Sequence, residues 1–331
     1  MGNFSKMQIS GFQSLSFRGT ALPPKHEKTA VKKETQEHEP LSAINMPSAD
    51  VFVPKKVEIR TIPDFIEFKP AETIEEAKKF ARDNFLTDRY ELTDIDIANY
   101  INEALSEYYN KNNAALPVVR RVLVKPEAAV GLVTINPSRS VLYVGEDDFK
   151  NIDGLIEKFL NDDVVKERCQ NADKTYNLTE SQKKYFEFCK AGTKDYSALS
   201  LKEKIGLFLF LRALSGEKFT DNAGNKMTLP DGGIFWIINH EMGHKEHCDR
   251  IGPKKYIELN ADFKNCKSRE EAKAKFREIE PNWETTLKVS DYAASRPVEF
   301  VAEVFACLQN GVKFDDDVME LYEKYGGPKI A

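Results

Sequence analysis

The chain has 331 residues, of which 41% are hydrophobic and 31% charged, and its formal net charge at pH 7 is -5. This composition predicts a soluble globular enzyme, and the negative charge argues against nucleic acid as a partner. No segment reaches the ~18 apolar residues of a membrane helix, and the start of the chain lacks the apolar core of a secretory signal. We therefore expect no membrane span and a cytoplasmic location by default, with non-standard secretion left open.

The cysteines give no sign of a covalent or metal framework. They lie at positions 169, 189, 248, 266 and 307, an odd number without Cys-x-x-Cys spacing. The sequence therefore predicts neither a disulfide scaffold nor a cysteine-bound zinc, as is typical of a reducing compartment.

Residues 1–62 differ in composition from the rest of the chain. They contain mixed charged runs such as 32–40 and show no periodic apolar face. A segment of this kind buries too little apolar surface to fold alone, so we expect a disordered tail. Residues 63–331 are long enough to enclose a large core and a cleft, and we expect one domain there with a helical insertion at about 151–228.

The elements expected first in this domain are two helices and a small mixed sheet. Thr73 to Glu76 form a capping box for a helix that runs to about Asn84. Apolar residues at helical spacing from Ile97 to Tyr108 predict the second helix. The predicted strands are segments 118–124, 130–135 and 141–144, the last two joined by 136–139.

The pattern His-Glu-x-x-His occurs at His240, Glu241 and His244. On a helix, residues i and i+4 lie about 40° apart around the axis and roughly 6 Å apart along it, so both imidazoles can bind one metal ion. Glu241 then lies beside the metal as a possible base. The uncharged run 234–238 indicates a buried helix, with Asp231 as candidate N-cap and Gly252-Pro253 as its end.

A third ligand is expected downstream. Residues 298–308 are apolar on all sides except for Glu299 and Glu303, which lie one helical turn apart and must both point inward. A catalytic zinc usually takes three protein ligands and keeps one position for water, so we predict Glu299 as the third. Glu303 is placed to accept the free N–H of a liganding histidine. Pro297 fits the first turn of this helix, and Asn310-Gly311 fits its end.

The motif His240 to His244, together with the run from Tyr292 to Phe305, resembles the catalytic core of the gluzincin metallopeptidases typified by anthrax lethal factor. The resemblance implies that a tyrosine seven residues before the ligand glutamate assists the oxyanion, which is Tyr292 here. It also supports Glu299 as ligand and Glu303 as the glutamate four residues later. Segment 73–148 is similar to the lead-in of lethal factor-like domains.

Each site residue also has a structural interpretation. His240 and His244 could be a buried pair satisfied by Glu241, Glu299 could bind backbone N–H groups, and Tyr292 could be a core aromatic. His247 shares a face with His240 but lies about 10 Å along the axis from it, too far to share its zinc ion, so we predict a non-ligand.

These inferences define an expected fold and reaction. The fold is α+β and zincin-like, with a small mixed sheet packed on the metal helix and the Glu299 helix closing the site. The function is a metalloendopeptidase in which one catalytic zinc ion activates water, Glu241 is the general base and a protein or peptide is the substrate. An extended substrate is expected to pair with an edge strand, for which segment 141–144 is the candidate. The acidic run 146–148 nearby is either a solvated loop or a feature that favours basic substrates.

The sequence leaves two other classes of protein open. The domain could bind zinc without catalysis, as an inactive binding or structural module. It could also be a delivered toxin or effector protease whose tail is a secretion signal.

Overall fold

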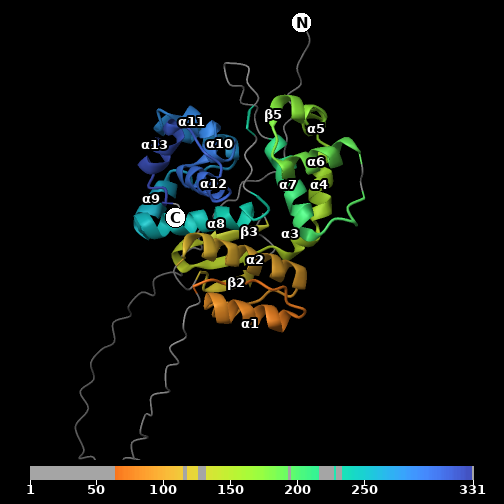
Figure 1. Cartoon of the computed structure of the whole chain (residues 1–331). Helices are drawn as coiled ribbons and strands as arrows, with labels where there is room; N and C mark the ends of the chain where they lie inside the picture. Colours follow the sequence, from red (N-terminus) through yellow and green to blue (C-terminus); the bar gives the residue numbers. More distant parts are fainter. Residues whose placement is uncertain are drawn as a thin grey trace, which may run out of the picture. The chain divides into compact units, whose positions relative to one another are not determined.

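The computed structural model describes residues 64–114, 118–125, 132–192, 195–215, 227–228 and 233–329, which all belong to one compact unit. The tail expected over 1–62 lies outside the described residues. In the described ranges the fold is mixed α+β, with many helices, one four-stranded sheet and one two-stranded sheet (Figure 1).

The α-helices are α1 (Ile74–Phe85), α2 (Ile95–Asn112), α3 (Glu146–Lys150), α4 (Ile152–Leu160), α5 (Asp163–Thr175), α6 (Glu180–Lys190), α7 (Leu201–Ser215), α8 (Trp236–Ile251), α9 (Pro253–Ala261), α10 (Arg269–Ile279), α11 (Trp283–Leu287), α12 (Pro297–Gln309) and α13 (Asp316–Lys324). The 3-10 helices are η1 (Pro137–Arg139) and η2 (Ala293–Ser295). The strands are β1 (Arg89–Tyr90), β2 (Arg121–Val124), β3 (Val133–Asn136), β4 (Val141–Val144), β5 (Tyr176–Asn177) and β6 (Met227–Thr228).

The main sheet has the strand order β1-β2-β4-β3. Its first three strands run parallel, and β3 pairs antiparallel with β4 across the η1 connection, in register Ile135 to Leu142. The predicted mixed sheet is therefore confirmed, but the prediction that segment 141–144 is an edge strand is wrong. Its uninterrupted apolar sequence instead suits an inner strand, because β2 covers one edge and β3 the other. In the described part of the chain, β3 is the edge strand beside β4.

The helix starts expected from the sequence follow the capping rules. The Thr73 side chain accepts from the Glu76 N–H, and the Glu76 carboxylate accepts in return from the Thr73 N–H. At α2, Glu146 accepts from the N–H groups of Thr93 and Asp94, at 2.6 and 3.1 Å. Glu146 is buried, so this member of the acidic run 146–148 neither lies in a solvated loop nor faces a substrate; it joins α3 to the start of α2.

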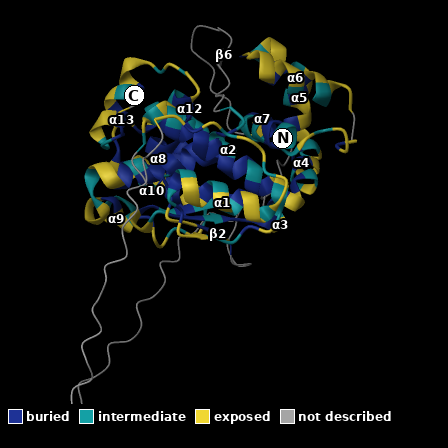
Figure 2. Ribbon diagram, turned by 60° about the horizontal axis from the view of Figure 1, so that its bottom comes forward, coloured by how far each residue is buried: buried dark blue, intermediate teal, exposed yellow. Residues whose placement is uncertain are grey.

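The His-Glu-x-x-His sequence lies on α8, which is largely buried between α12 and the β3 edge of the sheet (Figures 1 and 2). The helix ends where predicted, at Gly252 with φ 84°, and α9 follows directly from Pro253. Its start differs from the prediction. Asp231 lies outside the described residues, and the helix begins at Trp236 with Phe235 in the N-cap position and no side-chain cap.

The contact between α8 and α12 depends on Gly243. A Cβ atom at this position would lie 3.0 Å from the Ala302 Cα and 3.2 Å from two atoms of Phe305. Because the nearest of these is a backbone atom of α12, an added methyl group would push the two helices apart. Absence of a side chain at Gly243 therefore sets the distance between these helices.

The helical segment predicted for 151 to about 215 is present as α4–α7. Its apolar residues Ile156, Val165, Ile205 and Leu211 are fully buried in the same core cluster as the sheet, α1 and α2. Helix α7 contacts α2 as well as its neighbours α4, α5 and α6. A second cluster joins α10–α13 around Phe276 and Phe300.

Residues 325–328 pack onto the far half of α8. The Nε2 atom of His247 lies 2.8 Å from the Tyr325 carbonyl oxygen, and the Arg250 guanidinium donates to the Gly327 carbonyl. The Tyr322 hydroxyl donates to the Pro328 carbonyl at 2.8 Å. Burial lowers the pKa of His247 to about 4, so its ring is neutral and engaged here.

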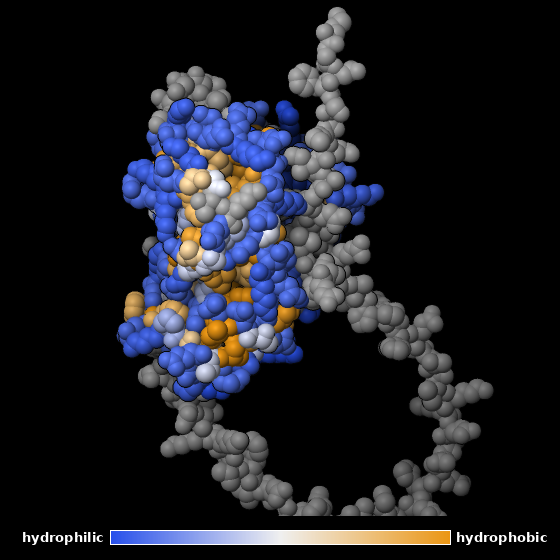
Figure 3. Space-filling view, turned by 90° about the vertical axis from the view of Figure 1, so that its right-hand side faces the viewer, coloured by the Kyte–Doolittle hydropathy of each residue, from blue (hydrophilic) through white to orange (hydrophobic). Residues whose placement is uncertain are grey.

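The surface agrees with the charged composition. The face shown in Figure 3 is hydrophilic at its margins, with apolar patches between them. Among the described residues, the most exposed large apolar side chains are Phe65, Val124, Val164, Ile257 and Ile279, which come from different elements. In the same part of the chain, no helix combines the length and the apolar composition that a membrane span requires.

Replacement of Gly243 by alanine tests the helix contact. Alanine favours an isolated helix over glycine by about 1 kcal/mol, but the clash with α12 should reverse the sign and destabilise the protein by about 1–3 kcal/mol. Gly154→Ala in α4 is the matched control, because its Cβ would meet only the side chain of Asn151, which can turn away. Urea unfolding of both variants measures the difference; equal stability of the two would contradict the close contact.

Candidate metal centre

Two histidines and one glutamate converge at the contact of α8 with α12. The Nε2 atoms of His240 and His244 lie 3.3 and 3.2 Å from one oxygen, Oε2 of Glu299. The two imidazole rings are perpendicular, with centroids 4.8 Å apart. Ligand atoms of all three residues lie within 4.8 Å of one another, so this buried group could hold a metal ion.

The separations fit a small tetrahedral ion. Bonds of about 2.0–2.1 Å from nitrogen and oxygen to a metal place neighbouring ligand atoms of a tetrahedron about 3.3 Å apart. The two N to O distances match this edge length, and the two nitrogens lie within 4.8 Å of each other. The Glu299 Oε2 atom is buried and has no hydrogen-bond partner, which leaves its charge directed at the centre of the group.

Burial and the contacts among the three side chains shift the pKa of each. Burial lowers the pKa of His240 to about 4, so this ring is neutral and offers a lone pair. Burial raises the pKa of Glu299, but the charge of His244 and contacts with both imidazoles outweigh it and hold this pKa well below its usual range. Burial lowers the pKa of His244, but the charge of Glu299 outweighs it and raises this pKa. Glu299 is therefore ionised in a desolvated position, and its charge is compensated either by a protonated His244 or by a metal cation held by the three side chains.

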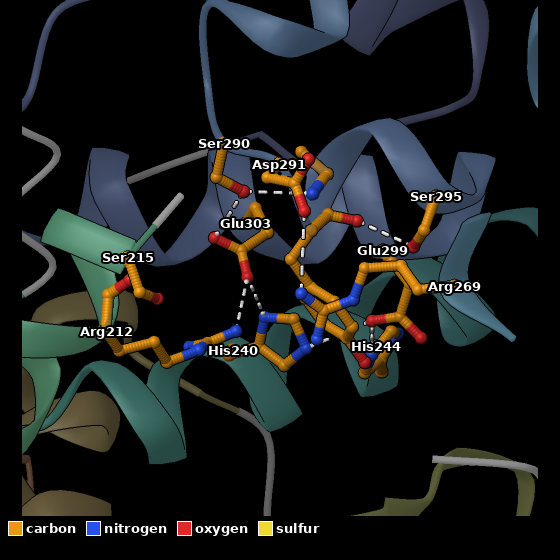
Figure 4. A network of polar contacts seen from close by, with 12 residues as sticks. Arg212, Ser215, His240, His244, Arg269, Ser290, Asp291, Ser295, Glu299 and Glu303 are labelled. Atoms are coloured by element: carbon orange, nitrogen blue, oxygen red, sulfur yellow. Dashed lines mark hydrogen bonds and ion pairs between the residues drawn. The ribbon is translucent and has the colours of Figure 1, made fainter. Parts of the chain in front are cut away.

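Each imidazole keeps Nε2 toward the centre and Nδ1 toward an outer partner (Figure 4). For His240 this neighbour is Glu303, the residue expected from the sequence, but its Oε1 lies 3.6 Å from Nδ1 and the two atoms form no hydrogen bond. For His244 it is the hydroxyl of Tyr256 on α9, 2.9 Å from Nδ1. A metal on Nε2 requires the proton on Nδ1, so the Tyr256 oxygen would accept it.

Glu303 is itself held by two further residues. Ser290 donates to its Oε2 at 3.2 Å, and the Arg212 guanidinium lies 3.6 Å from its Oε1. Burial raises the pKa of Glu303 to about 7, against the lowering effect of Arg212.

Glu241 lies between the centre and the edge strand. Its Oε2 accepts from the Ile135 N–H of β3 at 2.8 Å. Burial raises the pKa of Glu241 to about 7, and the charge of Glu299 adds to this increase. A carboxyl group with such a pKa can take up and release a proton near neutral pH.

Tyr292 directly precedes η2 and faces His240, with 5.8 Å between ring centroids. The guanidinium carbons of Arg212 and Arg269 lie 5.3 and 5.1 Å from the Tyr292 ring centroid. Burial raises the pKa of Tyr292 well above its usual value, and the charges of Glu299 and Glu241 contribute. The tyrosine is therefore a neutral hydrogen-bond donor near both carboxylates.

All the site residues expected from the sequence thus lie around one centre, and His247 lies outside the ligand group as expected. The sequence analysis missed Tyr256, Arg212 and Ser290. Tyr256 is one of twelve tyrosines. Nothing in its local sequence separates it from a core aromatic; it reaches His244 because α9 follows α8 directly through Gly252 and Pro253.

No family model, curated protein or solved structure matches this chain. The chemistry of the centre therefore has to be argued from its own geometry.

Substitution of Tyr256 tests the orientation of His244. Tyr256→Phe keeps the ring but removes the oxygen at Nδ1, so Zn²⁺ affinity should fall by about 10- to 100-fold. Tyr322→Phe is the matched control, since its hydroxyl forms a buried hydrogen bond away from the centre. Chelator competition gives both affinities. Wild-type affinity in Tyr256→Phe would rule out a role of this hydroxyl in metal binding.

Proposed function

We propose that this chain is a zinc-dependent metalloendopeptidase with a zincin-like fold of the gluzincin type. The observation that carries the proposal is the convergence of His240, His244 and Glu299 on one point, with Glu241 held beside them on the same helix. A structural metal site has no need of a nearby carboxyl group whose pKa lies near neutrality.

The donor set favours zinc. Two imidazoles and one carboxylate are a usual ligand set for catalytic zinc, and they leave a fourth position for water or substrate. When bound, zinc supplies a Lewis acid that polarises a carbonyl and makes water more acidic. The ionised Glu299 and the neutral His240 are the forms that such an ion binds.

Glu241 is the proton carrier in this proposal. Its carboxylate takes a proton from the attacking water and passes it to the nitrogen of the leaving amine. The Ile135 N–H fixes one of its oxygens, so the other is free to turn toward the reacting water. A pKa of about 7 lets the same group act first as base and then as acid.

The substrate surface is β3 in this proposal. The Ile135 N–H points away from β4, toward Glu241, so the edge of β3 opposite β4 faces the centre. An extended peptide that pairs along this edge would bring its backbone carbonyls to the metal. Strand β3 therefore replaces segment 141–144 as the proposed strand for substrate pairing.

Tyr292 is the oxyanion donor. Burial keeps its hydroxyl protonated, and its place beside His240 would let it donate to a substrate carbonyl held at the centre. A donor aimed at the charge that develops during attack lowers the barrier without tightening substrate binding.

Glu241→Gln is the central test. It keeps the shape of the side chain, so bound zinc should stay near one per chain while turnover falls by about 10²-fold or more. Glu246→Gln on the same helix is the control, since Glu246 accepts from Tyr108 and does not reach the centre. Mapping of new N-termini in a proteome treated with each protein would find cleavage sites; undiminished cleavage by Glu241→Gln would refute the mechanism.

Tyr292→Phe separates the packing of the ring from the hydrogen bond that the hydroxyl would donate to the oxyanion. Packing and zinc content should stay normal, because neither needs the hydroxyl, while kcat falls by roughly 10- to 1,000-fold and KM changes little. Steady-state kinetics on a peptide identified in the N-terminus mapping measures both constants. A wild-type kcat would make Tyr292 a core aromatic.

A further inference from the structure

Arg212 reaches the metal centre from outside the two helices that carry the ligands. It lies in the last turn of α7, the final helix of the α4–α7 segment. Its guanidinium carbon is 4.4 Å from the Trp236 ring centroid and 5.3 Å from that of Tyr292, and a terminal nitrogen is 3.6 Å from Glu303 Oε1. Figure 4 shows the side chain extending along the centre toward Glu303 and His240.

The three neighbours of Arg212 have one residue in common, the ligand His240. The Trp236 ring lies 5.0 Å and the Tyr292 ring 5.8 Å from the imidazole, centroid to centroid, and Glu303 faces its Nδ1. Arg212 therefore contacts the groups that surround His240 without being one of the residues whose ligand atoms converge at the centre.

We propose that Arg212 is a positioning residue, which holds Glu303 and Tyr292 in the places from which they act on His240 and on the substrate. The α4–α7 segment is then a part of the site rather than a separate insertion. The effect of Arg212 on His240, through Glu303, concerns metal binding alone. Its effect on the substrate, through Tyr292, rests on the function proposed above.

The charges around Glu303 support this role. Glu303 and Glu299 are both buried acidic residues on one face of α12, and the carboxyl group of Glu303 lies against a guanidinium. In the described part of the chain, the basic side chain that lies within 4.0 Å of Glu303 is that of Arg212. The nearby Arg269 is paired with Asp291, at 3.5 Å. Held in this place, Glu303 faces Nδ1 of His240 at 3.6 Å, which leaves Nε2 of this ring directed at the centre.

The guanidinium of Arg212 can stack on rings and donate to a carboxylate at the same time, which an ammonium group cannot do. Its planar face stacks on aromatic rings while its edge donates to a carboxylate. Arg212 contacts two rings and one carboxylate at once, and its side chain is only 28% exposed, so it fixes their mutual positions. Lysine at this position would keep the charge but lose the stacking.

The test compares Arg212→Met, Arg212→Lys and Lys202→Met in the full chain. Lys202 is on the same helix and pairs with Glu103 on α2, away from the centre, so it is the matched control. Zn²⁺ affinity is measured by chelator competition, kcat and KM by peptide cleavage, and stability by urea unfolding. Metal affinity is also measured for Glu303→Gln and for its combination with Arg212→Met.

Arg212→Met should bind Zn²⁺ about 10-fold more weakly and lose about 10- to 100-fold in kcat, with little change in KM. Arg212→Lys should recover most of the zinc affinity but not the kcat, and Lys202→Met should leave both unchanged. Because Arg212 acts on the metal through Glu303, the double variant should bind Zn²⁺ no more weakly than Glu303→Gln alone.

Other results would overturn the proposal. If Arg212→Met loses stability only, or if its effect on zinc affinity adds fully to that of Glu303→Gln, Arg212 is a structural ion pair. If Arg212→Met does not fold, wild-type zinc affinity and kcat in Arg212→Lys lead to the same conclusion. Absence of cleavage by the wild type would refute the proposed protease function, whereas the zinc measurements would still decide the positioning role.

Discussion

The crossing of α8 over α12 at Gly243 is the contact on which the rest of the site depends. Gly243 lies between the two histidines of the motif, and the backbone of Ala302 lies against it. Only at this short distance can Glu299, on a helix more than 40 residues further along the chain, reach the nitrogens of both histidines. A glycine in the middle of a helix lowers helix stability. Here it lets the two helices pack closely, so that the side chains of His240, His244 and Glu299 come together.

Burial of the site explains much of its electrostatic character. The same desolvation that makes His240 neutral also raises the pKa of Glu241 and of Glu303, while Glu299 stays ionised because it faces both imidazoles. Three carboxylates on two adjacent helices would repel one another if all were ionised without compensation. Each carboxyl group has its own neighbour: Glu241 faces the edge strand, Glu303 faces Arg212, and Glu299 faces the two imidazoles.

Local features of the site can be predicted because short stretches of sequence determine them. The spacing of His240 and His244, the apolar surroundings of Glu299 and Glu303, and the helix ends at Gly252 and Asn310 all follow from helix geometry and capping. Segment 141–144 is an inner strand, which its uninterrupted apolar sequence fits, whereas the identity of its neighbours β2 and β3 depends on tertiary pairing. Tyr256 and Arg212 were missed for the same reason, since their roles come from the packing of α9 and α7 against the centre.

The packing of residues 325–328 on α8 has a consequence for how the protein is made. His247 and Arg250 follow the metal-binding motif on the same helix, and their polar groups are satisfied by carbonyls of Tyr325 and Gly327. During synthesis the motif emerges from the ribosome before these carbonyls exist, so the His247 ring and the Arg250 guanidinium are then hydrated instead of bonded to Tyr325 and Gly327. The packing around the far half of α8 is therefore completed only after about eighty further residues have been added.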